Sequence, residues 1–302
     1  MQSGRRLASV RVPAPTDRVP APLLVLVAIV SVQVGSSLAK GLFDDLGAAG
    51  VTLLRLGLSA LLLVAVLRPA VRRWSRASWA ASLLLGGAMA GMNFSFYLAL
   101  RTVPLGVAVT VEFLGPLLLA VVQTRRRLDL LWAALAAGGV ALLGLDGSSD
   151  VPLSGLLFAF VAGLFWAGYI LATAKVGQVL PGTAGLAVAL SFATLLVLPF
   201  GLPGAAGGLA DKPSLIGAAV AVALLSSVVS YGLELAALRR IPTRVFGILM
   251  SLEPAAAATS GLVVLGEALG PRELLALLLV SLASAGITLA GSREGPPVQP
   301  LE

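Results

Sequence analysis

The chain has 302 residues, of which 58% are hydrophobic and 12% are charged, with a formal net charge of +7 and a mean hydropathy of +0.99. Soluble globular domains carry about 25% charged residues, so the composition excludes a soluble protein and indicates a polytopic membrane protein. The sequence has no cysteine and no histidine, which excludes disulfides, metal or haem ligation by these residues, and cysteine or serine–histidine catalysis.

Ten apolar segments are long enough to cross a bilayer, which takes about 20 residues of helix. In the first half they are Leu23–Ala39, Val51–Leu67, Trp79–Leu98, Leu105–Val122 and Leu128–Leu145. In the second half they are Leu153–Ala174, Thr183–Pro199, Leu215–Leu238, Val245–Val264 and Arg272–Ala290. The connections are short, so the predicted fold class is all-α and integral to the membrane, with no soluble domain.

The basic residues predict how these segments are oriented. With the N-terminus inside, sixteen of the 21 Lys and Arg residues fall at the cytoplasmic side, and only Arg101, Lys212 and Arg272 lie in outer loops. Positive residues favour cytoplasmic loops, so both termini are expected in the cytoplasm. The net positive charge is then explained by topology, and no nucleic-acid partner is expected.

The two halves repeat each other. Residues 99–116 (ALRTVPLGVAVTVEFLGP) and 237–254 (ALRRIPTRVFGILMSLEP) align without a gap at an offset of 138 residues. Five spans in each half place the second copy in the membrane upside down, which is the inverted-repeat architecture of secondary transporters. The expected organisation is a disordered basic tail (1–22), a first repeat (23–145), a second repeat (153–290) and a C-terminal cytoplasmic tail (291–302).

Two carboxylates lie inside the predicted spans, and each stands shortly before a proline. Glu112 precedes Pro116, and Glu253 precedes Pro254. A proline ring removes a helical hydrogen bond, so both prolines are expected to kink their helices and free backbone carbonyls. Because charges in hydrocarbon are costly, both glutamates are candidates for a central polar site. The alternative is a structural ion pair with Arg55, and for Glu234 an ion pair with Arg239 or Arg240 is favoured.

Other polar residues recur at helical spacing and extend this candidate site. Trp166 and Tyr169 lie too deep for interfacial anchors and are expected to line a cavity. The full set of predicted substrate-binding residues is Gln33, Ser36, Lys40, Arg55, Asn93, Tyr97, Glu112, Trp166, Tyr169 and Glu253. Lys40 and Arg55 can hold a carboxylate while Glu112 meets an ammonium, so a zwitterion suits the pocket. No metal site and no phosphate-binding loop are present, and no cofactor is expected.

The chain resembles the drug/metabolite transporter superfamily, specifically its ten-helix EamA branch, over about Leu23 to Ala290. The strongest stretches are GGAMAGMNFSFYLALRTVPLGVAVTVEFLGPL (86–117) and LRRIPTRVFGILMSLEPAAAATSGLVVLGE (238–267), supported by SVQVGSSLAKGLF (31–43) and GVTLLRLGLSALLL (50–63). Within the branch, the similarity is to members that export threonine and homoserine across the bacterial inner membrane.

The resemblance implies export of small polar amino acids by alternating access, driven by protons or another gradient, without a cofactor and without enzymatic activity. One alternative is an exporter of another metabolite or a drug on the same fold, because fold does not fix substrate. A channel or a membrane receptor fits less well, since neither a ring of like polar groups nor a soluble output domain is visible. The partners expected are therefore an amino-acid substrate, protons and the lipid bilayer.

Overall fold

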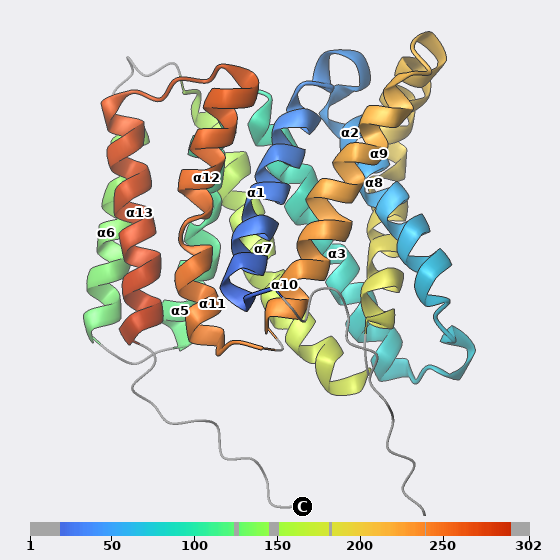
Figure 1. The fold of residues 1–302 in the computed structure, drawn as a ribbon, viewed down its shortest axis with the longest axis horizontal. Helices are drawn as coiled ribbons and strands as arrows, with labels where there is room; N and C mark the ends of the chain where they lie inside the picture. Colours follow the sequence, from blue (N-terminus) through green and yellow to red (C-terminus); the bar gives the residue numbers. More distant parts are fainter. Residues whose placement is uncertain (1–18, 124–126, 145–150, 181–182, 239, 291–302) are drawn as a thin grey trace, which may run out of the picture.

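The computed structural model describes residues 19–123, 127–144, 151–180, 183–238 and 240–290. The predicted C-terminal tail, residues 1–18 of the predicted N-terminal tail, and Arg125 and Arg126 of the basic loop lie outside these ranges. The last two residues of the predicted N-terminal tail, Ala21 and Pro22, already belong to a helix, so the tail is shorter than predicted. All regular elements within the described ranges are helices (Figure 1). Nine of these helical stretches are long and apolar enough to cross a membrane, and Leu130–Leu143 is a further, shorter apolar stretch. The chain is therefore a multi-pass membrane protein with about nine to ten spanning helices.

The first half of the chain contains α1 to α6. Their bounds are α1 Ala21–Lys40, α2 Phe43–Leu67, α3 Arg76–Leu100, α4 Leu105–Glu112, α5 Leu114–Gln123 and α6 Arg127–Gly144, with a short 3₁₀ turn at Val71–Arg73. In α2 the backbone breaks at Gly47, whose φ of 67° is a left-handed value that glycine adopts without strain. The apolar part of α2 therefore starts after this break, close to the predicted Val51.

The second half contains α7 to α13. Their bounds are α7 Leu153–Val179, α8 Ala184–Asp211, α9 Leu215–Ala223, α10 Ser230–Leu238, α11 Thr243–Met250, α12 Glu253–Ser260 and α13 Pro271–Ala290. Two π-helical segments interrupt the sequence of α-helices, η3 at Leu224–Val229 and η4 at Gly261–Leu265.

The predicted end of the seventh span at Pro199 is wrong. Helix α8 continues through Pro199 and Pro203 to Asp211. A proline inside a membrane helix is tolerated where neighbouring groups satisfy the freed carbonyl. Just beyond the helix end, Lys212 is held by an ion pair with Asp45 of α2, so the added turns of α8 pack against α2 rather than ending in a loop.

The helix interruptions lie just before the two prolines. Helix α4 ends at Glu112, and α5 starts at Leu114 with Pro116 in its first turn. Helix α11 ends at Met250, and α12 starts at Glu253 with Pro254 in its first turn. A first turn has no helical acceptor for the missing N–H, so proline fits there without loss. Each proline thus follows a break rather than kinking a continuous helix.

The helices pack in pairs that join the two halves. Helix α2 packs against α8, α6 against α13, and α4 against α12, while α1 packs against α10 and α3 against α7. The start of α1 and the end of α13 lie at one end of the bundle, drawn at the bottom of Figure 1 and called the lower end below. The turn between α1 and α2 and the start of α13 lie at the other, upper end.

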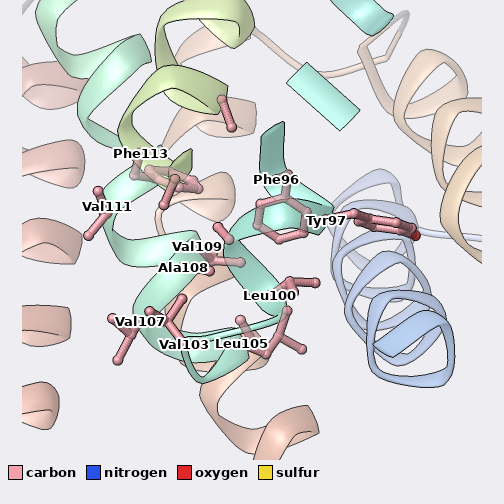
Figure 2. Packing of buried hydrophobic residues seen from close by; sticks show 14 of the residues in the cluster. Phe96, Tyr97, Leu100, Val103, Leu105, Val107, Ala108, Val109, Val111 and Phe113 are labelled. Carbon is pink, nitrogen blue, oxygen red and sulfur yellow. The ribbon is translucent and has the colours of Figure 1, made fainter. Parts of the chain in front are cut away.

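A buried apolar cluster stabilises the region around α3 and α4. Figure 2 shows Phe96, Tyr97 and Leu100 of α3 beside residues of α4 and the position just after it, namely Val107, Ala108, Val109, Val111 and Phe113. Because lipid is as apolar as these side chains, the cluster stabilises the region by close van der Waals packing rather than by the hydrophobic effect. This packing fixes the end of α4, and with it the position of Glu112, relative to α3.

Candidate functional site

A cavity of about 470 Å³ lies in the middle of the bundle, between the two halves of the chain. Its walls come from α1 to α5, α7, α10, α11, α12 and α13. It extends down to Leu238, the last residue of α10, and to Thr288 near the end of α13, so it reaches the lower end. Its size is in the range of small-molecule sites.

Eight of the ten residues predicted as substrate-binding line this cavity, and two do not. Those at the wall are Gln33, Ser36, Arg55, Asn93, Glu112, Trp166, Tyr169 and Glu253. The structure thus brings together side chains from both halves that are far apart in the sequence. Pro116 also lines the cavity, whereas Pro254, Lys40 and Tyr97 are not part of its wall.

Arg55 is held from three directions and is 5% exposed. Its Nε donates to Ser227 Oγ at 3.3 Å, NH1 donates to the Tyr97 hydroxyl at 3.1 Å, and NH2 donates to the Ser226 carbonyl at 2.9 Å. A guanidinium has five N–H donors, so among the described residues one donor on each terminal nitrogen remains. Because Arg55 also lines the cavity, it presents a fixed positive group to whatever the cavity holds.

Tyr97 belongs to this support, which corrects its predicted role at the cavity wall. Its side chain is fully buried, and the Arg55 guanidinium lies 5.4 Å from the centre of its ring. The hydroxyl accepts from Arg55 while the ring contacts the cation, an arrangement that stabilises a buried guanidinium. Tyr97 therefore lies behind Arg55 and orients it.

The cavity also contains carboxylates. Glu112 and Glu253 are 9% and 6% exposed, and Glu234 of α10 lines the same space. No ion pair within 4.0 Å joins Arg55 to Glu112 among the described residues, which argues against the structural ion pair considered from the sequence. No group of acidic side chains in the described ranges converges closely enough to hold a metal ion.

Glu112 is positioned by a close contact between the break after α4 and helix α7. Gly163 of α7 lies so near the Glu112 carbonyl and the Gly115 backbone that a Cβ there would overlap them. The contact also brings Trp166 of α7 against Phe113, with ring centroids 4.9 Å apart in an edge-to-face arrangement. Small residues at helix contacts allow this approach in membranes. The wall carrying Trp166 and Tyr169 is thereby docked beside Glu112.

Lys40 has a different place from the one predicted. Its ammonium forms an ion pair with Glu267 at 2.5 Å and donates to the Val103 carbonyl at 2.8 Å. Glu267 in turn accepts from the Leu105 N–H at 2.8 Å, at the first residue of α4. These contacts, called the upper latch below, join the end of α1, the turn between α3 and α4, and the segment before α13. They lie at the upper end, away from the cavity wall.

Four residues of α10 line the cavity, and none of them is in the predicted substrate-binding set: Ser230, Tyr231, Glu234 and Leu238. The ion pair of Glu234 with Arg239 or Arg240 stays a prediction, because Arg239 lies outside the described residues. The periodicity of an α-helix places Ser227 and Tyr231 on one face, but the π-helical turn of η3 changes this register. As a result Ser227 holds Arg55, and the next turn faces the cavity.

The chain is similar to several known proteins. The model of the EamA-like transporter family matches residues 153–289. The protein named threonine/homoserine exporter RhtA from Escherichia coli (strain K12) is 44% identical over 274 residues, covering 90% of this chain and 92% of that protein. The protein of the same name from Salmonella typhimurium (strain LT2) is 43% identical over 288 residues, covering 93% and 97%.

Two further matches are more distant. The uncharacterised protein PA1977 from Pseudomonas aeruginosa is 34% identical over 265 residues and covers 83% of this chain. A solved crystal structure aligns with a TM-score of 0.60 and 22% identity, over 90% of this chain and 97% of that one. At this identity the solved structure supports the fold alone.

Proposed function

The chain belongs to the EamA-like transporter family, and we propose that it exports small polar amino acids such as threonine and homoserine across the bacterial cell membrane. The observation that carries the proposal is the similarity to exporters of these two amino acids over nine tenths of the chain. The relatives are named as exporters rather than enzymes, which supports transport rather than catalysis as the activity.

The groups at the cavity wall fit such a substrate. Arg55 has one unused donor on each terminal nitrogen, which suits the carboxylate of an amino acid. Glu112 and Glu253 offer acceptors for the ammonium group, and either also suits a transported proton. A bulky apolar drug would leave these buried groups unpaired, at a cost of about 1–3 kcal/mol each.

We further propose that the two halves form an inverted repeat of five spans each, residues 23–145 and 153–290. The pairing of helices supports this arrangement. Exchanging the halves turns the contact between α1 and α10 into the contact between α7 and α3, and leaves the pairs α2 with α8 and α6 with α13 unchanged. A two-fold relation between halves produces this pattern, and the cavity then lies at their interface.

The proposed transport cycle is alternating access, and this structure fits its inward-facing state. The cavity reaches the lower end, where the basic residues of the connecting segments predict the cytoplasm. At the upper end the latch of Lys40 and Glu267 joins three segments over the cavity. In an outward-facing state this latch opens, and contacts at the lower end close.

Export from cells tests the proposed function. Overexpression should raise resistance to toxic external homoserine or threonine and lower the intracellular pool of the amino acid, and deletion of the gene should have the opposite effects in a strain without a second exporter. Unchanged resistance and pools, with the protein confirmed in the membrane, would exclude these substrates. Export of a different solute in the same cells would then identify a family member of other specificity.

A further inference from the structure

Two side chains that line the cavity are buried, yet each has an oxygen atom without a partner in the described part of the protein. Gln33 Oε1 of α1 and Ser230 Oγ of α10 form no hydrogen bond, and the residues are 4% and 1% exposed. Buried polar atoms are nearly always hydrogen-bonded, and leaving one unpaired costs about 1–3 kcal/mol. Two such atoms at one cavity indicate that a ligand supplies their partners.

Both residues belong to the wall that also contains Arg55. Helix α1 packs against η3 and α10, and Ser31 of α1 donates to the Leu225 carbonyl of η3 at 2.8 Å. Ser226 and Ser227 in this π-helical segment bind the guanidinium. Ser230 follows one turn later. A substrate whose carboxylate binds Arg55 therefore has the rest of its atoms near this wall.

We propose that Gln33 and Ser230 form a subsite for the side-chain hydroxyl of the substrate and determine the preference for hydroxylated over apolar amino acids. The proposal rests on the function proposed above. Gln33 Oε1 accepts a hydrogen bond from the hydroxyl, and the Ser230 hydroxyl donates to or accepts from the same oxygen. Both amino acids named for the relatives carry a hydroxyl.

The subsite disfavours apolar amino acids as well as binding hydroxylated ones. Valine has nearly the shape of threonine, and norvaline nearly that of homoserine, but each has a methyl group where the hydroxyl would be. Either would leave Gln33 and Ser230 unpaired in the occupied cavity. Sites built to hydrogen-bond a substrate hydroxyl discriminate strongly against analogues that lack it.

The test measures transport of the four amino acids by the purified full chain in liposomes. The wild-type protein should transport threonine over valine, and homoserine over norvaline, with a ratio of kcat/KM of at least about 10. Gln33→Met keeps the side-chain length and removes the amide, and Ser230→Ala removes the hydroxyl. Each change should lower both ratios of kcat/KM, hydroxylated over apolar, by roughly 10-fold. This factor corresponds to the loss of one hydrogen bond of about 1.4 kcal/mol.

Ser82→Ala is the matched control. Ser82 of α3 is fully buried and its hydroxyl also lacks a partner among the described residues, but it does not line the cavity. This variant should keep the wild-type ratios. A cavity variant that is poorly folded would lose transport of all four amino acids in parallel, whereas loss of the subsite changes the ratios.

Three results would overturn the inference. The first is that the wild-type protein transports valine as well as threonine, and norvaline as well as homoserine. The second is that Gln33→Met and Ser230→Ala both keep the wild-type ratios of kcat/KM. The third is that Ser82→Ala changes these ratios as much as the two cavity variants do. Each leaves amino-acid export standing. If the wild-type chain transports none of the four amino acids, the proposed function itself fails.

Discussion

Glu112 is a carboxylate at the cavity wall, directly before the break that separates α4 from α5. If it binds the substrate ammonium or a proton, Glu112→Gln keeps the shape and removes the charge. We expect export to fall at least about 10-fold, because hydrogen bonds to charged groups contribute about 1.5–3 kcal/mol. The measurement is initial efflux rate at matched membrane expression.

Asp211→Asn is the control for this change, since Asp211 is exposed at the end of α8 and outside the cavity. It should leave export unchanged. Normal export by a well-expressed Glu112→Gln protein would show that Glu112 has only a structural role.

At the residue scale the sequence predicts much of the cavity wall but not the partner of each group. Helical spacing correctly places Asn93 at the wall, yet Tyr97, one turn later, lies behind Arg55. Lys40 is predicted in the pocket because helical spacing places it on the same face as Gln33 and Ser36. Its partner is Glu267 instead, which comes near only through the tertiary fold. Periodicity describes one helix and carries no information on what packs against it.

The upper latch makes a prediction at the scale of elements. Its ion pair is partly buried, with side-chain exposures of 21% and 16%, and we expect its loss to favour the state open at the upper end. The chain has no cysteine, so Ser36→Cys at the cavity wall reports access directly. An impermeant maleimide added outside should label Ser36→Cys several-fold faster when Lys40→Ala is also present.

The control breaks a second ion pair at the same end. Lys212 pairs with Asp45, and neither lines the cavity, so Lys212→Ala should leave labelling of Ser36→Cys unchanged. Equal acceleration by Lys212→Ala, or no effect of Lys40→Ala, would contradict a gating role for Lys40 and Glu267.

The contact of α7 with the break after α4 gives a prediction about stability. Gly163→Ala inserts a methyl group against the Glu112 carbonyl, and such overpacking costs about 1–3 kcal/mol. Gly177→Ala, in the same helix, adds a Cβ that would meet no atom of another described segment within 4 Å, so it should be neutral or stabilise by up to about 1 kcal/mol. Thermal unfolding of the two purified variants checks this. Equal unfolding temperatures would show that α7 can move away at no cost.

At this scale the sequence predicts the existence and order of the helices well, because apolarity over about 20 residues is a strong signal. It predicts their interruptions less well. The two prolines mark the breaks only approximately, since proline fits the first turn after a break. The π-helical turn at Leu224–Val229 leaves no mark in the pattern of apolar residues. That turn creates the support for Arg55, so it is the part of the site that sequence reasoning lacks.

For the whole molecule, the inverted repeat predicts one topology. Reporter fusions should place both termini, and the segments near Arg72 and Arg126, in the cytoplasm. Fusions near Arg101 and Lys212 should report the outer side. The physical reason is the distribution of basic residues, which favours the cytoplasmic face. A fusion near Arg126 that reports the outer side would contradict five spans in the first half.

The central claim is that the protein transports small hydroxylated amino acids through the cavity between its two halves. Its most direct test is counterflow of labelled homoserine by the purified chain in liposomes. We predict that liposomes preloaded with unlabelled homoserine or threonine accumulate the label transiently, and that Glu112→Gln reduces this at least about 10-fold. Accumulation no greater than in protein-free liposomes, from a folded wild-type protein, would contradict the account.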